Sequence, residues 1–275
     1  MGGGARNGHH SPDRRSASDE AKTYGEILEE EIEAGLVELR RPTGGLVLSA
    51  LSAGLDVGFG ILAMAVVATL AAGELPTLIV RLLEANAYTI GFVFVILGRS
   101  ELFTEHTTLA ALPVLDGRAG IARLLRLWGL VYLGNVAGAI AFATAIALLM
   151  PRLGLASPAT FGEIALRLTD HRPWLIFLSA ILAGWLMGLL SWLVTAARDT
   201  TGKLLMIWLV TGVIALAGLH HSIAGAVEVV AGLVAGEGIT LASAARCLGL
   251  AAVGNAVGGI VFVALIKYGH ASSTT

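Results

Sequence analysis

The dominant feature of this chain is a series of long apolar segments separated by short polar ones. Six of them are close to, or above, the roughly 20 residues that an α-helix needs to cross a bilayer. They are Gly44–Ala72, Ala85–Leu112, Leu127–Met150, Pro173–Ala197, Leu204–Leu233 and Ala244–Lys267. The third and fourth segments contain no charged side chain at all. The pattern predicts six transmembrane helices and an all-α polytopic membrane protein.

The composition agrees with this pattern and excludes other classes of protein. The chain is 56% hydrophobic and 14% charged, whereas average soluble domains carry roughly 25% charged residues. A net charge of −2 without a basic patch argues against a nucleic-acid partner. The single cysteine, Cys247, excludes a disulfide framework. The 35 glycines favour helices packed through small residues, not a β-barrel with aromatic girdles.

The predicted domain organisation has three parts. Residues 1–41 form a disordered cytoplasmic tail plus a short amphipathic helix, residues 42–270 form the six-helix transmembrane channel domain, and residues 271–275 form a C-terminal tail. The first 19 residues are polar and lack the apolar stretch of a signal peptide. Apolar residues at helical spacing between Tyr24 and Leu39 predict a helix that lies against the membrane face or a neighbouring subunit.

The distribution of basic residues predicts the orientation in the membrane. An even number of spans places both termini on one side. If that side is cytoplasmic, the inside flanks carry eight basic residues and the outside flanks carry five. The inside residues are Arg40, Arg41, Arg118, Arg123, Arg126, Arg198, Lys203 and Lys267, and the outside residues are Arg81, Arg152, Arg167, Arg172 and Arg246. This positive-inside bias predicts a multi-pass protein of the inner (plasma) membrane with cytoplasmic termini.

The first three spans repeat in the last three. The stretches Ser49–Gly58 and Ser179–Gly188 both fit S-A-x-x-A-G-x-x-x-G, and Tyr132–Phe142 and Ala252–Phe262 both contain G-N-x-x-G-x-I-x-F. Corresponding stretches lie 130 and 120 residues apart. Because each half has three spans, the second half must enter the membrane from the opposite face. The sequence therefore predicts two inverted three-helix repeats.

Polar clusters interrupt the second and fifth spans, which the repeat pairs with each other. The first cluster follows Gly98, and the second contains His220, His221 and Ser222. Ionisable groups and non-helical backbone are tolerated at membrane depth only where they are buried in protein or line a cavity. Matched broken helices therefore indicate a transport path, whose half-helix N-termini suit an anion. The matched residues Asn135 and Asn255 are expected to hydrogen-bond to other helices or to the broken backbone.

Four short stretches resemble the formate/nitrite transporter family, in a divergent, YfdC-like branch. They are Ser100–Thr104, Tyr132–Asn135, His221–Ala224 and Val253–Gly259, and the resemblance extends from about Thr43 to Tyr268. The resemblance implies an aquaporin-like fold with broken second and fifth helices. It also implies a homopentamer with one pore in each subunit, surrounded by membrane lipids.

The resemblance also assigns roles to particular residues. It implies that Leu102 and Phe103 narrow the pore, and that Thr104 faces a central histidine, His221. Arg172 falls where the family carries a lysine near the outer vestibule. An imidazole in a dry constriction either donates a hydrogen bond to a small anion or hands it a proton.

The chain departs from the family pattern at four positions. Gly188 replaces an asparagine that helps to hold the histidine, and His220 replaces an acidic residue. Arg99 stands where a small residue is usual, and His106 replaces an asparagine. These four positions are expected on or near the lumen, and His220 is as well suited to a structural hydrogen bond as to a functional role.

Three further polar groups leave alternatives open. Glu101 either neutralises Arg99 or accepts hydrogen bonds from backbone amides, and a structural role is favoured. Arg99 either locks the loop through an ion pair or attracts anions. Asp56 is alone in the first span, so it is a functional candidate, although a subunit-interface or arginine-pairing role fits equally well.

These features predict a channel for small monovalent anions or their conjugate acids, formate-like or nitrite-like, with proton coupling through His221. The alternative is a pore of the same shape for a small neutral solute, which Arg99 and Arg172 disfavour. An intramembrane hydrolase that uses Ser222 lacks a positioned catalytic carboxylate, so no enzyme activity is expected. No cofactor motif is present, and the spacing of the histidines predicts no metal site.

Overall fold

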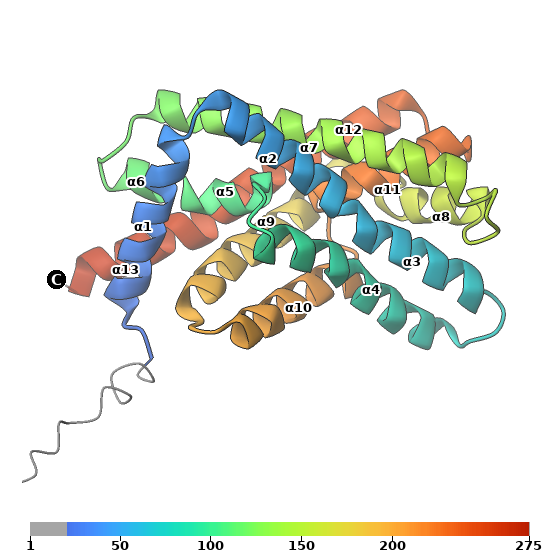
Figure 1. Ribbon diagram of the computed structural model, residues 1–275, viewed down its shortest axis with the longest axis horizontal. Helices are drawn as coiled ribbons and strands as arrows, with labels where there is room; N and C mark the ends of the chain where they lie inside the picture. The colour runs from blue at the N-terminus through green and yellow to red at the C-terminus, as the bar shows by residue number, and fades with distance from the viewer. Residues whose placement is uncertain (1–20, 275) are drawn as a thin grey trace, which may run out of the picture.

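The computed structural model describes residues 21–274, so the tail predicted before residue 21 lies outside the described residues. Every regular element of the described part is helical (Figure 1). The elements are α1 (Tyr24–Arg40), α2 (Thr43–Asp56), α3 (Gly58–Ala71), α4 (Thr77–Leu97), α5 (Phe103–Leu109), α6 (Leu112–Leu115), α7 (Ile121–Leu149), α8 (Pro158–Thr169), α9 (Pro173–Ala196), α10 (Thr200–Leu216), α11 (Ser222–Ala235), α12 (Leu241–Gly259), the π-helical segment η1 (Ile260–Leu265) and α13 (Ile266–Thr274).

Five helices of the described part are long and apolar enough to cross a membrane. They are Thr43–Ala71, Thr77–Leu97, Ile121–Leu149, Pro173–Ala196 and Leu241–His270. The predicted fifth span is instead two shorter apolar helices, α10 and α11. The all-α polytopic architecture is therefore confirmed.

Both predicted interruptions are present. After α4, the backbone leaves the helical conformation at Arg99, whose φ is 58°, and α5 begins at Phe103. After α10, Gly218 takes a φ of 62°, and α11 begins at Ser222. The second span starts earlier than predicted, because Arg81 near the start of α4 made this part of the sequence look like a loop.

The two halves use the same close helix crossing. A Cβ atom built on Gly54 of α2 would lie 2.1 Å from the carbonyl oxygen of Asn135 on α7, and one built on Gly184 of α9 would lie 2.1 Å from that of Asn255 on α12. No side chain fits at either glycine, so the backbones of each pair touch. The small-residue motif of the repeat therefore sets the packing in both halves.

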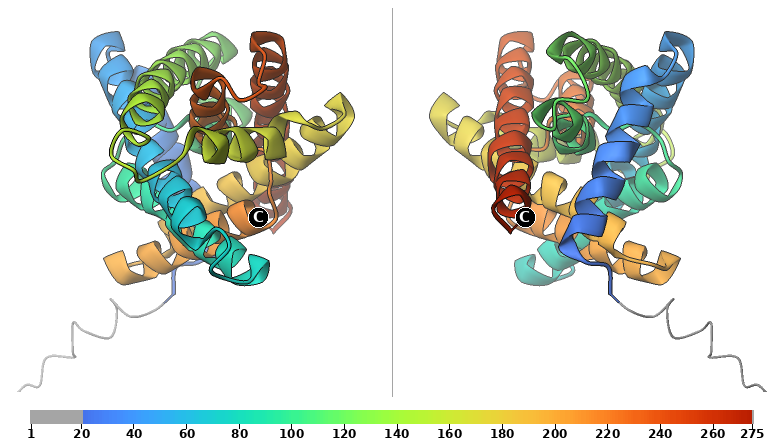
Figure 2. Two further views of the ribbon diagram at one scale, coloured as in Figure 1. Left: turned by 90° about the vertical axis from the view of Figure 1, so that its right-hand side faces the viewer. Right: turned by 90° about the vertical axis from the view of Figure 1, so that its left-hand side faces the viewer.

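The two ends of the described chain lie at the same end of the molecule (Figure 2). The Tyr24 hydroxyl of α1 donates to the carbonyl oxygen of Lys267 in α13 at 2.7 Å, and the two rings of Tyr24 and Trp192 are 4.8 Å apart. Helix α8 lies at the opposite end (Figure 1). This arrangement follows from an even number of membrane crossings.

The amphipathic helix predicted before the first span exists, but it packs on its own chain. Its buried residues include Ile32 and Leu36, which cluster with Leu112 and Trp192. A Cβ built on Gly35 would lie 2.3 Å from the carbonyl oxygen of Leu109 in α5. The apolar side of this helix, expected against the membrane face or a neighbouring subunit, packs on its own chain instead, because the broken second span supplies α5 and α6 as partners.

The close approach at Gly35 predicts a difference between two glycines of the same helix. We expect Gly35→Ala to loosen the docking of α1, because its methyl group would overlap the backbone of α5. Gly25→Ala meets nothing within 4 Å, and should stabilise α1 by up to about 1 kcal/mol through helix propensity. Trypsin cleavage between Arg40 and Arg41 in detergent would report the docking. Equal cleavage rates in the two variants would contradict the expectation.

Candidate functional site

Two cavities lie at opposite ends of the bundle. The α8 cavity, of about 380 Å³, is lined by residues that include Arg81, Glu84, Tyr88, Arg167, His171 and Glu228. The α1 cavity, of about 630 Å³, is lined by residues that include Glu30, Glu38, Arg99, Glu101, Glu105 and Lys203. No residue lines both cavities.

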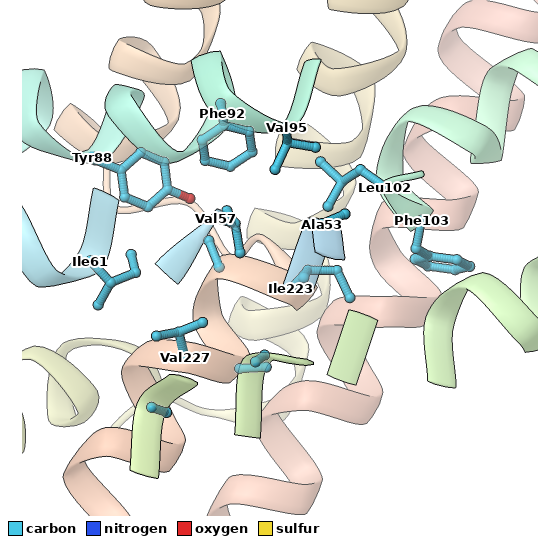
Figure 3. Close-up of a cluster of buried hydrophobic side chains, with 14 of the residues drawn as sticks. Ala53, Val57, Ile61, Tyr88, Phe92, Val95, Leu102, Phe103, Ile223 and Val227 are labelled. Carbon is cyan, nitrogen blue, oxygen red and sulfur yellow. The ribbon is translucent and has the colours of Figure 1, made fainter. Parts of the chain in front are cut away.

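An apolar layer separates the two cavities. Helix α4 runs between them, since Tyr88 lines the α8 cavity and Ile96 lines the α1 cavity. Eight residues of α-helix correspond to about 12 Å. Between these positions, the side chains of Phe92 and Val95 are fully buried, and Leu102 is fully buried beside them. Figure 3 shows Tyr88, Phe92 and Val95 in a row along α4, with Leu102 next to Val95.

A pair of polar side chains, His221 and Thr104, lies within this apolar layer. The Nε2 atom of His221 is 2.8 Å from Oγ1 of Thr104, and the two residues are 2% and 0% exposed. The ring of Phe92 stands perpendicular to the imidazole with centroids 5.0 Å apart. Each residue comes from one of the two broken spans, Thr104 from α5 and His221 from the residue before α11.

The hydrogen bonds of His221 determine where its ring proton lies. His221 is the N-cap of α11, and Nδ1 accepts hydrogen bonds from the backbone N–H groups of Ile223 and Ala224 at 3.3 and 3.2 Å. An acceptor nitrogen carries no proton, so the proton of a neutral imidazole lies on Nε2. Nε2–H then donates to Thr104, whose own hydroxyl hydrogen is directed elsewhere. A second proton on Nδ1 would face two N–H donors and would break the cap.

One asparagine in each half holds the broken backbone. The side-chain Nδ2 of Asn135 donates to the carbonyl oxygens of Ala50 and Glu101 at 2.8 Å, and its Oδ1 accepts from the N–H of Phe103 at 2.8 Å. In addition, the N–H of Glu101 donates to Oγ of Ser49 at 3.2 Å. The start of α5, and with it Thr104, is thereby fixed to α2 and α7.

The second half repeats this network at corresponding positions. Nδ2 of Asn255 donates to the carbonyl oxygens of Ala180 and His220 at 2.8 and 2.9 Å, and its Oδ1 accepts from the N–H of Ser222 at 2.8 Å. The N–H of His220 donates to Oγ of Ser179 at 3.2 Å. The start of α11, and with it His221, is fixed in the same way.

Glu101 does not pair with Arg99, which corrects that alternative. Its carboxylate contacts the guanidinium of Arg41, and its Oε2 lies 2.6 Å from Nε2 of His106. Arg99 is exposed, has a left-handed backbone and lines the α1 cavity. Nδ1 of His106 lies 2.9 Å from the carbonyl oxygen of Leu102, so His106 and Glu101 brace the loop.

The other predicted site residues lie at some distance from the two cavities or have structural partners. Phe103 packs against Tyr132, with ring centroids 5.0 Å apart, and lines neither cavity. Arg172 is exposed at the N-cap of α9 and lines neither cavity. His220 contacts Oγ of Ser179 and the carbonyl oxygen of Leu168, each at 2.9 Å.

Gly188 and Asp56 also pack against, or hydrogen-bond to, neighbouring side chains. A Cβ on Gly188 would lie 2.3 Å from Oγ1 of Thr108 and 2.8 Å from Cγ2 of Val263, so an asparagine cannot occupy this position unless these side chains move. Asp56 accepts hydrogen bonds from Ser52 and Ser100 at 2.9 and 3.3 Å. Of the alternatives for Asp56, arginine pairing is therefore not the one observed, since two hydroxyl groups bind the carboxylate.

A third acidic group is buried where α1 packs on α9. Glu31 is 1% exposed and accepts hydrogen bonds from the hydroxyls of Ser191 and Thr195. Burial raises the pKa of the Glu31 carboxyl, although these two hydroxyls lower it. These hydrogen bonds attach α1 to α9.

Within the described residues, one group brings three candidate metal-ligand atoms together. Its members are Glu38, Glu101 and His106. The guanidinium of Arg41 contacts both carboxylates, so part of their charge is already compensated by a side chain of the protein. The group therefore joins α1 to the loop of the second span.

The carboxylates of the α8 cavity, Glu84 and Glu228, are not among the site residues predicted from the sequence. Glu84 forms an ion pair with Arg167 at 2.8 Å, and Glu228 lies in the middle of α11. A single carboxylate in an apolar stretch was the available signal for Glu228. The signal for Glu84 was weaker, since it lies close to the apparent start of its span.

Two inverted halves that each contribute a broken helix to a buried polar pair define a membrane channel or transporter fold. A model of the formate/nitrite transporter family matches residues 25–269. The chain belongs to this family. It is 36% identical to the inner membrane protein YfdC of Escherichia coli (strain K12) over 197 residues, which cover 71% of this chain and 62% of YfdC.

A second relative supports the assignment, and a solved structure shares the fold. A probable formate transporter of Methanothermobacter thermautotrophicus is 30% identical over 274 residues, covering 92% of this chain and 96% of the relative. A solved pentameric formate channel with formate bound has the same fold, with a TM-score of 0.71 at 23% identity, covering 83% of this chain and 97% of that one.

Proposed function

We propose that this protein is a transmembrane pathway for small monovalent anions of the formate and nitrite kind, or for their conjugate acids, and that it is not an enzyme. The His221–Thr104 pair between two cavities carries this proposal. Membership of the formate/nitrite transporter family supports it.

The free-energy cost of moving an ion into the apolar layer indicates the role of the His221–Thr104 pair. An ion that enters the layer loses water, and apolar walls provide no hydrogen bonds in return, so the cost is several kcal/mol or more. Nε2–H of His221 and the hydroxyl of Thr104 are the donors that can replace that water. The geometry therefore supports the first of the two roles expected for His221, which is donation of a hydrogen bond.

Swelling of protein-loaded vesicles tests the proposed function directly. Vesicles with the protein should swell in iso-osmotic formate, nitrite, hydrosulfide, lactate or acetate, whereas protein-free vesicles should swell more slowly. Gluconate, a larger anion, serves as the control for leakage. Swelling in a small neutral solute but in none of these anions would instead support a neutral-solute pore.

We also propose that the end of the molecule that carries α1 faces the cytoplasm. Several basic residues counted on the inside flanks gather there: Arg126 donates to the carbonyl oxygen of Arg41, Arg118 pairs with Glu29, and Lys203 lines the α1 cavity. This grouping supports the positive-inside orientation. The α8 cavity would then open to the outside.

The assembly is expected to be a homopentamer. The solved formate channel with the same fold is pentameric, and large apolar side chains such as Trp208 and Leu209 are exposed on α10. Native mass spectrometry in a mild detergent should give five copies of the 28.4 kDa chain. A monomer or dimer under these conditions would contradict the expectation.

A further inference from the structure

Among the described residues, the carboxyl group of Glu228 has no partner. Glu228 is 9% exposed, lies in the middle of α11 and lines the α8 cavity. No hydrogen bond or ion pair joins it to another side chain of the described residues. The nearby cation, Arg167, is bound by Glu84 at 2.8 Å. The carboxyl group is thus almost enclosed by protein, and only the cavity is open to it.

The surroundings of Glu228 contain few other titratable groups. Helix α4 contributes Arg81, Glu84 and Tyr88 to the cavity, α8 contributes Arg167, and His171 follows α8. On α12, Cys247 is buried near Glu228. Helices α3 and α7 bring no charged side chain to this cavity among the described residues.

Glu228 stands at the boundary between the α8 cavity and the apolar layer. It follows His221 by seven residues, which is two helical turns or about 10 Å along α11, so both residues lie on the same side of the helix. The ring centroids of Tyr88 and Phe92 are 5.1 Å apart, and those of Phe92 and His221 are 5.0 Å apart. On this route, Glu228 is the last carboxyl group before the layer.

A permanently ionised Glu228 would be unfavourable for the protein and for its substrate. An enclosed carboxylate without a partner costs free energy, and its charge would repel an anion in the cavity. A proton removes both costs. His221 cannot supply a proton to the substrate without losing the cap of α11, because its Nδ1 already accepts two hydrogen bonds.

We propose that Glu228 is the proton donor that converts weak-acid anions into neutral acids in the α8 cavity before they pass Phe92. In this step the O–H bond of the Glu228 carboxyl breaks, an O–H or S–H bond forms on the substrate, and Glu228 becomes a carboxylate. A hydronium ion from the bulk solution then restores its proton. The inference rests on the proposed function and concerns those of its anions that are conjugate bases of weak acids.

Paired uptake measurements test this role. Vesicles would contain wild type, Glu228→Gln, Glu228→Asp or Glu163→Gln, with uptake of labelled formate and labelled nitrate measured at pH 5.5 to 8. Formate accepts a proton readily and nitrate does not. Glu163 is exposed on α8, so Glu163→Gln removes the same charge without touching the cavity.

We expect Glu228→Gln to lower formate uptake by about tenfold or more, to leave nitrate uptake unchanged or higher, and to flatten the rise of formate uptake at acidic pH. Glu228→Asp should recover part of the formate uptake, and Glu163→Gln should behave as wild type. Size-exclusion profiles should match across the variants.

Several results would overturn the role of Glu228. Equal losses of formate and nitrate would mean that Glu228 is structural, equal gains would mean that it only repels anions, and unchanged uptake would mean that it has no role. Wild-type vesicles that admit neither anion nor any other in the swelling series would overturn the proposed function, and this inference with it.

Discussion

Replacement of His221 by phenylalanine is expected to abolish anion flux while the protein still inserts and assembles. Phenylalanine keeps a ring of similar bulk beside Phe92, but it removes Nε2–H, which in wild type donates to Thr104 at 2.8 Å. The loss of a donor in a dry site is expected to lower the rate by about 100-fold or more. Loss of the N-cap would cost about 1 kcal/mol of stability as well.

Replacement of His221 by asparagine distinguishes two roles of the side chain, hydrogen-bond donation and proton transfer. Asparagine is a favourable N-cap and keeps an N–H donor, but it does not titrate. We therefore expect reduced flux that still rises at acidic pH, because the proton comes from Glu228. Flux that no longer depends on pH would show that the imidazole itself carries the proton. Wild-type flux in the phenylalanine variant would remove His221 from the mechanism.

Much of the fold was predictable because the membrane limits the choices. Backbone that crosses a bilayer must satisfy its own hydrogen bonds, so long apolar runs gave the helices, and the glycine motifs gave the repeat. The bounds of the broken spans were less predictable. Arg81 and Glu84 belong to α4 and line the α8 cavity. In the sequence, charged residues of a helix that face a cavity look the same as charged residues of a loop.

The site was predictable only in part, because partners are set by three-dimensional packing. The matched breaks indicated where the two spans are interrupted, and the resemblance to the formate/nitrite transporter family implied that Thr104 faces His221. The pairing of Glu101 with Arg41 could not be predicted, because 60 residues separate them and Arg99 lies closer to Glu101 in sequence. The docking of α1 on its own chain likewise depends on a short helix, α5, that exists only because the second span is broken.

The asparagines of the repeat offer the second large effect, this time on stability. We expect Asn255→Leu to destabilise the protein strongly, because the N–H of Ser222 and the carbonyl oxygen of His220 would both lose their side-chain partner. A buried orphan group costs about 1–3 kcal/mol, and both Asn255 and Ser222 are fully buried. The start of α11 would then shift, and His221 would move with it.

Asn135, the residue of the first half that corresponds to Asn255, allows the same prediction to be tested again. An exposed asparagine provides the control. Asn135→Leu should have an effect of similar size, because Asn135 binds the start of α5 through an equivalent set of hydrogen bonds. Asn86→Leu changes the same residue type at an exposed position of α4, where the amide contacts Trp208, so it should have little effect. Thermal unfolding in detergent should show a fall of roughly 10 °C for each buried variant. If Asn86→Leu lowers the midpoint as much as the two buried variants do, the amides do not hold the broken helices in place.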